Sequence, residues 1–193
     1  TSACFAMEMP WHKFDVVTFS FQKGLGGEGG HGVLILSPRA VERVNSHVPA
    51  WPVPKIFKLH KKGGVDTALF EGATINTPSL LVIEDAIDAL SWAEEIGGIE
   101  ALLKRVDTSF AHFMDWVGAS PHFEVLARDP ATISPTALCL VISDDWFTAQ
   151  PDEVQAGVVK SMLALLEAED VAVDINAYRD APTGLRIWSG PTV

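Results

Sequence analysis

The sequence predicts an α/β protein whose second part folds as a smaller α+β layer, and three observations support this prediction. Short runs of β-branched and aromatic residues alternate with amphipathic helical segments along the whole chain. The paired glycines Gly97 and Gly98 separate two consecutive helical segments. The 193 residues, 48% of them hydrophobic, suffice for a core in one domain and part of another. We place the boundary before the first of those helices, which gives domains over residues 1–77 and 78–193.

The first part of the chain predicts a strand, a glycine-rich loop, a second strand and a helix. Residues 16–21 are rich in β-branched and aromatic side chains, and residues 33–36 form another short apolar run. Ser37 and Pro38 are typical of a helix start and predict a helix over residues 39–45.

The middle of the chain contains a proline-rich segment followed by two helices. Residues 48–57 contain three prolines, so we expect them to be extended, poor in ladder hydrogen bonds and suited to packing on a surface or another subunit. Thr77 and Pro78 predict the cap and the first position of a helix over residues 78–96. Apolar residues at helical spacing predict the second helix over residues 99–117.

The last part of the chain alternates strands and a helix. Residues 123–126 and 138–142 are short apolar strands, and residues 151–169 carry the apolar stripe of a helix. Residues 171–175 predict a further strand. The adjacent aspartates at 144–145 would point opposite ways on an extended chain, which disfavours a paired-carboxylate site.

Composition limits the classes of partner. Lys and Arg number 14 against 25 acidic residues, and the net charge of −11 argues against nucleic acid or an anionic membrane as a general partner. Cys4 and Cys139 lie far apart without C-x-x-C spacing, which disfavours a disulfide scaffold or a zinc site and fits a reducing compartment. With no membrane-length apolar run and no basic signal segment, we expect a cytoplasmic protein without a metal site.

One lysine stands between the first strand and the glycine loop. Six of the nine residues after Lys23 are glycine, so the backbone can bend sharply there and approach a ligand closely. Gly24, Gly26 and Gly29 match the dinucleotide pattern G-x-G-x-x-G, but a strand rather than a helix is predicted after the loop. A phosphate-binding P-loop needs its lysine at the end of the loop, followed by Ser or Thr. The remaining interpretations are a nucleophilic amine that forms a Schiff base with pyridoxal phosphate, or a surface lysine beside a flexible turn.

Two arginines near the C-terminus are candidates for an anion site. A turn at residues 182–184 leads into a strand on which Arg186 shares one face with Trp188. Arg179 precedes this turn, so the two guanidinium groups can converge as a clamp for carboxylate or phosphate groups. Alternatively, one or both pair with acidic residues of this acidic chain.

Three separated segments fit one family. They are Ser20-Phe-Gln-Lys-Gly-Leu-Gly-Gly27, Ile75-Asn-Thr-Pro-Ser79 and Tyr178-Arg-Asp-Ala-Pro-Thr-Gly-Leu-Arg-Ile187. Together they resemble the phosphoserine aminotransferases, in the class V branch of the fold type I pyridoxal-phosphate enzymes, and the likeness runs through essentially the whole chain. The resemblance implies the C-terminal part of a three-layer α/β/α large domain, followed by a smaller α+β C-terminal domain.

The resemblance implies cofactor-binding residues. Lys23 corresponds to the family's Schiff-base lysine, and Gln22 beside it to a contact with the cofactor phosphate. Ser2 belongs to the Thr-Ser pair that follows the family's pyridine-nitrogen aspartate, and it is assigned to the cofactor site as well. Asn76 and Thr77 correspond to the pair that reaches the cofactor phosphate of the neighbouring subunit across a homodimer interface.

The resemblance also implies substrate-binding residues. Arg186 corresponds to the arginine that holds the amino-acid α-carboxylate, and Arg179 to a contact with the substrate's distal phosphate or carboxylate. Many members have His-Arg where this chain has Tyr178-Arg179, which leaves the details of distal-group binding open.

The implied reaction is ping-pong transamination, in which L-glutamate becomes 2-oxoglutarate and 3-phosphohydroxypyruvate becomes O-phospho-L-serine. The family's pyridine-nitrogen aspartate, phosphate-binding turn and stacking aromatic ring have no counterpart in this chain. We therefore expect the C-terminal half of an enzyme that needs an N-terminal half. The alternatives are another class V aminotransferase, of the alanine- or serine-glyoxylate type, or a catalytically silent fragment that needs an N-terminal partner.

Overall fold

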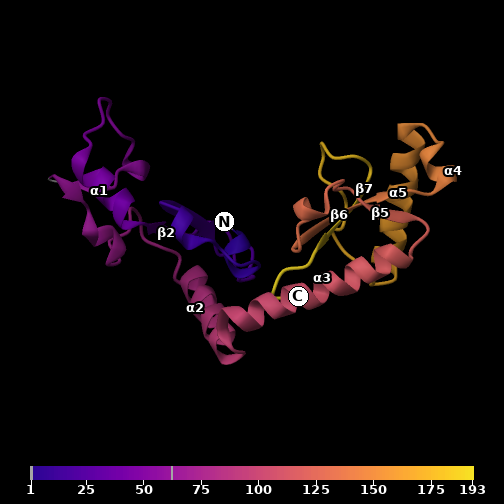
Figure 1. Cartoon of the computed structure of the whole chain (residues 1–193), viewed down its shortest axis with the longest axis horizontal. Coiled ribbons are helices and arrows are strands. Elements are labelled where there is room, and N and C mark those ends of the chain that lie inside the picture. Colours follow the sequence, from indigo (N-terminus) through magenta and orange to yellow (C-terminus); the bar gives the residue numbers. More distant parts are fainter. Residues whose placement is uncertain (1, 62) are drawn as a thin grey trace. The chain divides into compact units, whose positions relative to one another are not determined.

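In the computed structural model, which describes residues 2–61 and 63–193, the chain divides into two units, Thr1–Gly98 and Ile99–Val193 (Figure 1). Both units combine helices and strands, which confirms the predicted α/β class. Among the described residues, no helix is both long and apolar enough to cross a membrane.

An antiparallel hairpin lies at the centre of the first unit. β1 (Val16–Ser20) pairs with β2 (Gly32–Leu36), and the glycine loop connects them. α1 (Pro38–Ser46) follows directly, because the Ser37 hydroxyl accepts a hydrogen bond from the Ala40 N–H at 3.1 Å. The predicted order of strand, glycine loop, strand and helix is therefore confirmed.

Shorter elements make up much of the remainder of this unit. They are η1 (Ser2–Phe5), η2 (Trp11–Lys13), η3 (Lys55–Phe57), η4 (Thr67–Phe70) and a small hairpin of β3 (His60–Lys61) and β4 (Gly64–Val65). The proline-rich residues 48–54 form no helix or strand, which confirms that part of the prediction, whereas the helical turn η3 was not predicted.

α2 (Leu80–Glu95) begins later than the sequence predicts. Its N-cap is Ser79 rather than Thr77, so the predicted cap is wrong. Thr77 and Pro78 stay outside the helix, because the Ser79 N–H donates to the His31 imidazole and closes the preceding loop there.

The core of the first unit joins the glycine loop to α2. Phe21 and Leu25, which flank Lys23, are 9% and 6% exposed and pack against Val82 and Ala86 of α2. Burying a side chain of this size stabilises a fold by about 1.5–3 kcal/mol. The turn that carries Lys23 is therefore anchored on both sides.

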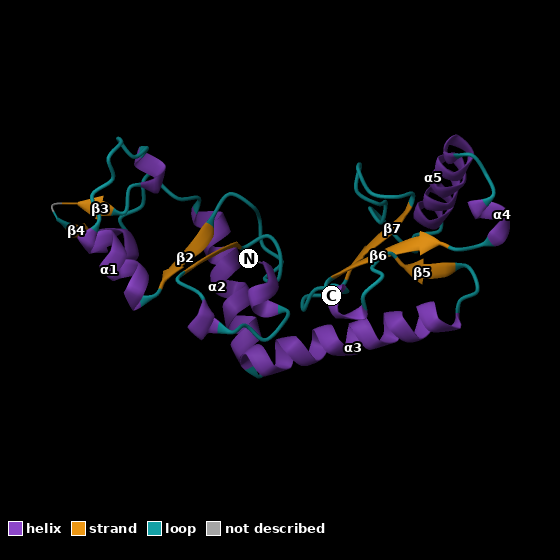
Figure 2. Ribbon diagram, turned by 45° about the horizontal axis from the view of Figure 1, so that its top comes forward, coloured by secondary structure: helices purple, strands orange, loops and turns teal. Residues whose placement is uncertain are grey.

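A three-stranded antiparallel sheet organises the second unit (Figure 2). Its strand order is β5 (Phe123–Val125), β6 (Ala137–Ile142) and β7 (Gly184–Trp188). Side chains of α3 (Gly98–Ala119) and α5 (Asp152–Ala168) pack against the core formed by Val117, Leu138, Leu140 and Leu185. The two helices and the three strands were predicted and are confirmed.

Residues 171–175 do not form the predicted strand. The Val171 N–H bonds back to a carbonyl of α5 at 2.9 Å, and Asp170 and Asp174 have left-handed φ angles of 56° and 54°. Left-handed residues turn the chain where a strand would extend it. The segment instead joins β7 through an isolated bridge at Asn176.

A short helix that the sequence did not reveal follows β6. The Asp144 carboxylate caps α4 (Asp145–Thr148) by accepting the Phe147 N–H at 3.1 Å. Its other oxygen lies 3.0 Å from Nδ1 of His122. The hydrogen bond from Phe147, with a smaller contribution from His122, lowers the pKa of Asp144 below its ordinary value. Asp144 is thus a capping residue.

Candidate active site

The backbone around Lys23 is fixed, whereas its amine is exposed. The Lys23 carbonyl accepts the Gly26 N–H at 2.9 Å, and the Phe21 carbonyl accepts the Gly27 N–H at 3.0 Å. The Lys23 side chain projects to the surface from between two buried anchors, Phe21 and Leu25. A primary amine held on a rigid turn is the arrangement that nucleophilic catalysis by lysine requires.

Gln22 lies across the glycine loop. The Gln22 Oε1 occupies the position that a Cβ at Gly29 would take, so the amide lies against the Gly29 backbone. Gln22 and Lys23 are consecutive exposed residues shortly after β1. Gly29 therefore has a structural role in the loop, because its missing side chain leaves space for Gln22.

Asn76 and Thr77 lie in the loop that precedes α2, and both are exposed. The Thr74 hydroxyl donates to the Asn76 carbonyl at 2.6 Å, which fixes the backbone of this loop. An amide and a hydroxyl on a constrained loop can donate hydrogen bonds to phosphate oxygens.

His31 connects the two loops, and the sequence analysis did not identify it. Its Nε2 accepts a hydrogen bond from the Ser79 N–H at 3.0 Å, which assigns the proton of the neutral ring to Nδ1. The glycine loop and the Asn76-Thr77 loop are thereby joined within one unit. A lone histidine among glycines gives no periodic signal, so the partner of His31 could only be seen in the fold.

Asp15 ties the base of the hairpin to α1. Its Oδ1 accepts hydrogen bonds from the Ser37 hydroxyl at 2.8 Å and the Arg39 Nε at 2.9 Å, and its Oδ2 pairs with the Arg39 Nη2. The bonds from Arg39 and then Ser37 lower the pKa of Asp15, and the bond to Asp15 raises that of Arg39. This network fixes the hairpin from which the glycine loop extends.

Arg186 lies on β7 in the second unit, with its side chain 23% exposed. The guanidinium carbon is 4.6 Å from the centre of the Tyr178 ring, and Nη2 is 3.8 Å from the Asp174 Oδ2. The buried Nε has no acceptor in the described part of the chain. Arg179 is exposed in the turn that precedes β7. The Arg186 guanidinium is thus contacted by Tyr178 and Asp174, and its hydrogen-bonding capacity is not fully used by the described residues.

The predicted site residues fall into two groups, one in each unit. Gln22, Lys23, Asn76 and Thr77 belong to the first unit, and Arg179 and Arg186 belong to the second. The backbone of Ser2 lies in η1, but its side chain is outside the described residues.

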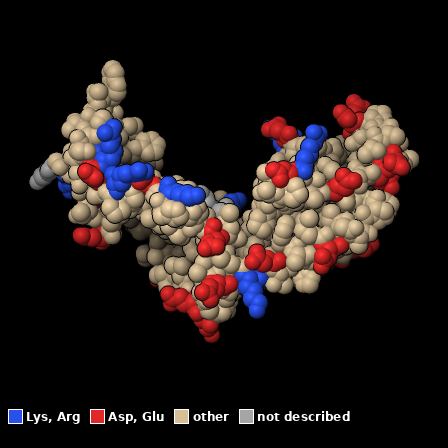
Figure 3. Space-filling model, viewed as in Figure 1, with Lys and Arg blue, Asp and Glu red and all other residues tan. Residues whose placement is uncertain are grey.

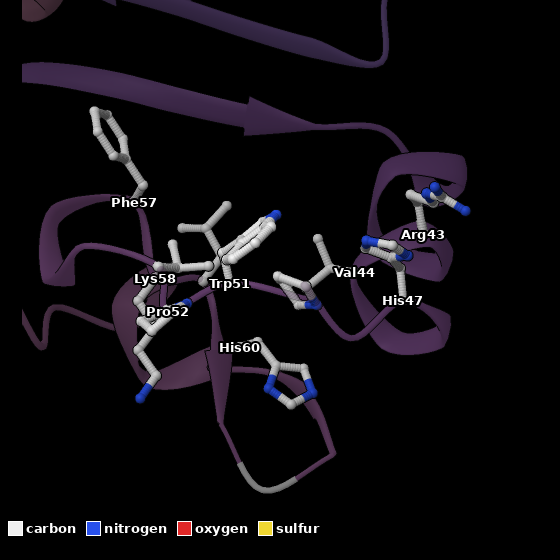
Figure 4. Close-up of a pocket in the computed structure, with 11 residues that line it drawn as sticks. Arg43, Val44, His47, Trp51, Pro52, Phe57, Lys58 and His60 are labelled. Carbon is white, nitrogen blue, oxygen red and sulfur yellow. The ribbon is translucent and has the colours of Figure 1, made fainter.

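A separate pocket lies beside the C-terminal end of α1 (Figure 4). Its volume is about 440 Å³, and its lining includes Arg43, His47, Trp51 and Phe57. The two aromatic walls are 82% and 70% exposed, and none of the predicted site residues lines this pocket. Across residues 2–61 and 63–193, no group of three or more His, Cys, Asp or Glu side chains is arranged to hold a metal ion.

The donors in the first unit fit a phosphorylated aldehyde cofactor such as pyridoxal phosphate. Lys23 supplies a primary amine and Gln22 a neutral hydrogen-bond donor, and Asn76 and Thr77 supply neutral donors of the kind that the resemblance assigns to the cofactor of a neighbouring subunit. At Gly30, with φ of 103°, no heavy atom lies within 4 Å of the position of a Cβ, so a ligand can approach the backbone there.

No protein-family model matches the chain, but curated proteins are similar to it. Curated phosphoserine aminotransferases of Methanosarcina barkeri and Methanosarcina mazei are each 48% identical over all 193 residues. The chain spans 50% of the length of each, about half of these relatives.

Solved structures match the fold. A phosphoserine aminotransferase studied for radiation damage of its Schiff base gives a TM-score of 0.74 at 18% identity, over 100% of this chain and 46% of that one. The phosphoserine aminotransferase of Cytophaga hutchinsonii gives 0.73 at 21% identity, over 98% of this chain and 48% of that one.

These matches show that the chain has the fold of about half of a phosphoserine aminotransferase structure. The chain is a homologue of the phosphoserine aminotransferases and corresponds to the C-terminal half of their length, which confirms the resemblance found in the sequence.

Proposed function

We propose that the chain is the C-terminal half of a phosphoserine aminotransferase that uses pyridoxal phosphate in serine biosynthesis. Such an enzyme transfers the amino group of L-glutamate to 3-phosphohydroxypyruvate and releases 2-oxoglutarate and O-phospho-L-serine. The observation that carries the proposal is the exposed Lys23 amine on a turn anchored by buried neighbours. An N-terminal half completes the enzyme, because the relatives are about twice as long as this chain.

Lys23 would perform two tasks. Its Nζ would hold the cofactor, and would be available for proton transfer once the amino substrate is bound. The amine would take the proton from the substrate Cα as general base and deliver it to the cofactor carbon as general acid. When bound, pyridoxal phosphate supplies the electron sink that makes this proton acidic.

The remaining donors of the first unit would hold the cofactor. Gln22 contacts the cofactor phosphate beside Lys23, and Ser2 contributes to the same site. Asn76 and Thr77 donate to the cofactor phosphate of a neighbouring subunit. Their exposure on a loop fixed by Thr74 supports this role, because both side chains are available to a second subunit.

The arginines of the second unit would bind substrate. Arg186 donates two hydrogen bonds to the α-carboxylate, which orients the breaking C–H bond, and Arg179 contacts the distal phosphate or carboxylate. The buried, unpaired Nε of Arg186 supports the first assignment, because the described chain does not satisfy this guanidinium by itself.

A homodimer with shared active sites is part of the proposal. The proline-rich segment exposes Val48, Trp51, Ile56 and Phe57 by 68% or more. Apolar and aromatic side chains gathered in this way are typical of protein interfaces. A cytoplasmic location also belongs to the proposal, supported by two free cysteines, Cys4 and Cys139.

The decisive experiment joins this chain to the N-terminal half of the Methanosarcina barkeri relative. After incubation with pyridoxal phosphate and borohydride reduction, peptide mass mapping should find the label on Lys23. Lys23→Ala should lose the label and the cofactor absorbance, whereas the exposed control Lys13→Ala should keep both. A label that persists in Lys23→Ala would refute the assignment.

Substrate assays separate the alternatives. The proposal expects transamination of 3-phosphohydroxypyruvate with L-glutamate to exceed that of glyoxylate with alanine or serine. The opposite preference would indicate another class V aminotransferase. A chimera that folds and binds the cofactor but transfers no amino group would indicate a catalytically silent half.

A further inference from the structure

We propose that Tyr178 positions Arg186 and that Asp174 is a counter-ion that gives way when a carboxylate binds to the guanidinium. The substrate part of this inference rests on the proposed function of Arg186. The arrangement of the three side chains is a property of the second unit and is tested separately.

The segment that carries Asp174 and Tyr178 is fixed against β7. The Arg186 N–H donates to the Ile175 carbonyl at 2.8 Å, and Asn176 forms a bridge with β7 next to Arg186. Asp174 and Tyr178 therefore extend from one stretch of chain that is hydrogen-bonded to the backbone of Arg186 itself. Their contacts with its guanidinium follow from this backbone pairing.

The face of the Tyr178 ring contacts the Arg186 guanidinium. The ring centre lies 4.6 Å from Cζ of Arg186, within the range of a cation–π contact. Contact with a face restricts the side-chain rotamer but leaves the N–H groups at the edge free to donate. Tyr178 is itself 59% exposed, so the ring that contacts Arg186 lies at the surface.

Asp174 neutralises the guanidinium without satisfying its donors. The 3.8 Å between Nη2 and the Asp174 Oδ2 is longer than a hydrogen bond, and the Asp174 side chain is 89% exposed. Exposed ion pairs of this kind are weak, whereas a substrate carboxylate can form two charge-assisted hydrogen bonds. A carboxylate can therefore displace Asp174 while Tyr178 keeps the guanidinium in place.

The geometric part is tested on the full chain by NMR of the arginine Nε–H groups. The Tyr178 ring current should shift the Arg186 resonance, Tyr178→Phe should retain that shift, and Tyr178→Leu should abolish it. Sodium acetate is the probe for carboxylate binding. Asp174→Asn should tighten acetate binding by about two- to fivefold, as expected for loss of a weak competing ion pair.

Asp170→Asn is the matched control, because Asp170 has a φ of 56° against 54° at Asp174 and its replacement removes the same charge. This control should leave acetate affinity at the wild-type value. Equal effects of the two Asp→Asn changes, or an Arg186 resonance that is unchanged in Tyr178→Leu, would overturn the proposal.

The substrate part is tested in the chimera with the N-terminal half of the relative. Tyr178→Leu should raise KM for L-glutamate by about three- to tenfold, Tyr178→Phe should not, and Asp174→Asn should lower KM while kcat stays constant.

If Lys23 fails its labelling test while the Arg186 spectra and acetate titrations behave as expected, the proposed function is wrong and the side-chain arrangement stands. If Lys23 is labelled but KM is the same in all variants, the substrate role of Tyr178 and Asp174 is wrong.

Discussion

His31 and Ser79 are joined by a 3.0 Å hydrogen bond from the Ser79 N–H to the imidazole Nε2, across 48 residues of sequence. The bond connects the end of the glycine loop to the start of α2, whose buried residues already pack against both sides of the Lys23 turn. The His31 side chain therefore holds together the glycine loop and the Asn76-Thr77 loop of the first unit, both of which we propose to contact pyridoxal phosphate.

His31→Ala is expected to release the start of α2. Loss of one partly exposed hydrogen bond should cost about 0.5–1.5 kcal/mol of local stability, so the Ser79 amide should exchange with solvent several-fold faster. Hydrogen exchange followed by NMR measures this directly. His12→Ala, at an exposed position outside the loop, serves as the control. Equal Ser79 exchange rates in wild type and His31→Ala would contradict the role of His31.

The sequence predicted those helices whose caps and apolar spacing are encoded by neighbouring residues. Ser37 and Pro38 marked the start of α1, and the apolar periodicity of residues 99–117 predicted most of α3. The prediction failed over residues 171–175, because left-handed residues at Asp170, just before this strand-like run, and at Asp174, within it, turn the chain.

Local sequence patterns also predicted only part of the candidate site. Lys23 could be singled out because a strand and a glycine loop flank it in the sequence. The His31 bond to Ser79 and the packing of Tyr178 on Arg186 depend on tertiary contacts or on side-chain orientation. Neither residue type nor spacing encodes these contacts, so only the structure could supply them.

Gly30 and Gly157 both have room for a Cβ but differ in backbone conformation, so their replacement by alanine should change stability in opposite directions. No heavy atom lies within 4 Å of a Cβ built on either Gly30 or Gly157, but Gly30 has a φ of 103° whereas Gly157 lies within α5. Gly157→Ala should raise the free energy of unfolding by about 0.5–1 kcal/mol, and Gly30→Ala should lower it. Urea denaturation measures both, and a stabilising Gly30→Ala would contradict the strained backbone.

Shortening a side chain in the hydrophobic core of the second unit should lower the stability of that unit. Leu140 is 2% exposed at the centre of the sheet, and Leu140→Ala should destabilise the second unit by about 2–5 kcal/mol through lost burial and a cavity. Leu165 on α5 is 63% exposed, so Leu165→Ala is the matched control and should change stability by less than about 1 kcal/mol. Calorimetric unfolding of the two variants compares them, and similar losses would place the core elsewhere.

Asp15 should make the stability of the hairpin depend on pH in the acidic range. Hydrogen bonds from Arg39 and Ser37 lower its pKa in the folded state below the ordinary value of 3.8. The folded state therefore holds this carboxylate in its charged form more strongly than the unfolded chain does. The resulting stabilisation is fully present above the unfolded-state pKa and is lost as the pH falls through the lower folded-state pKa.

Asp15→Asn removes this titration and tests its direction. The difference in urea midpoint between wild type and Asp15→Asn should be constant from pH 7 down to about pH 5, and should shrink as the pH falls further. Asp88→Asn, an exposed change on α2, controls for the general effect of removing one negative charge from an acidic chain. A difference that grows on acidification would mean that Asp15 is not stabilised by Arg39 and Ser37, because only a raised folded-state pKa gives that sign.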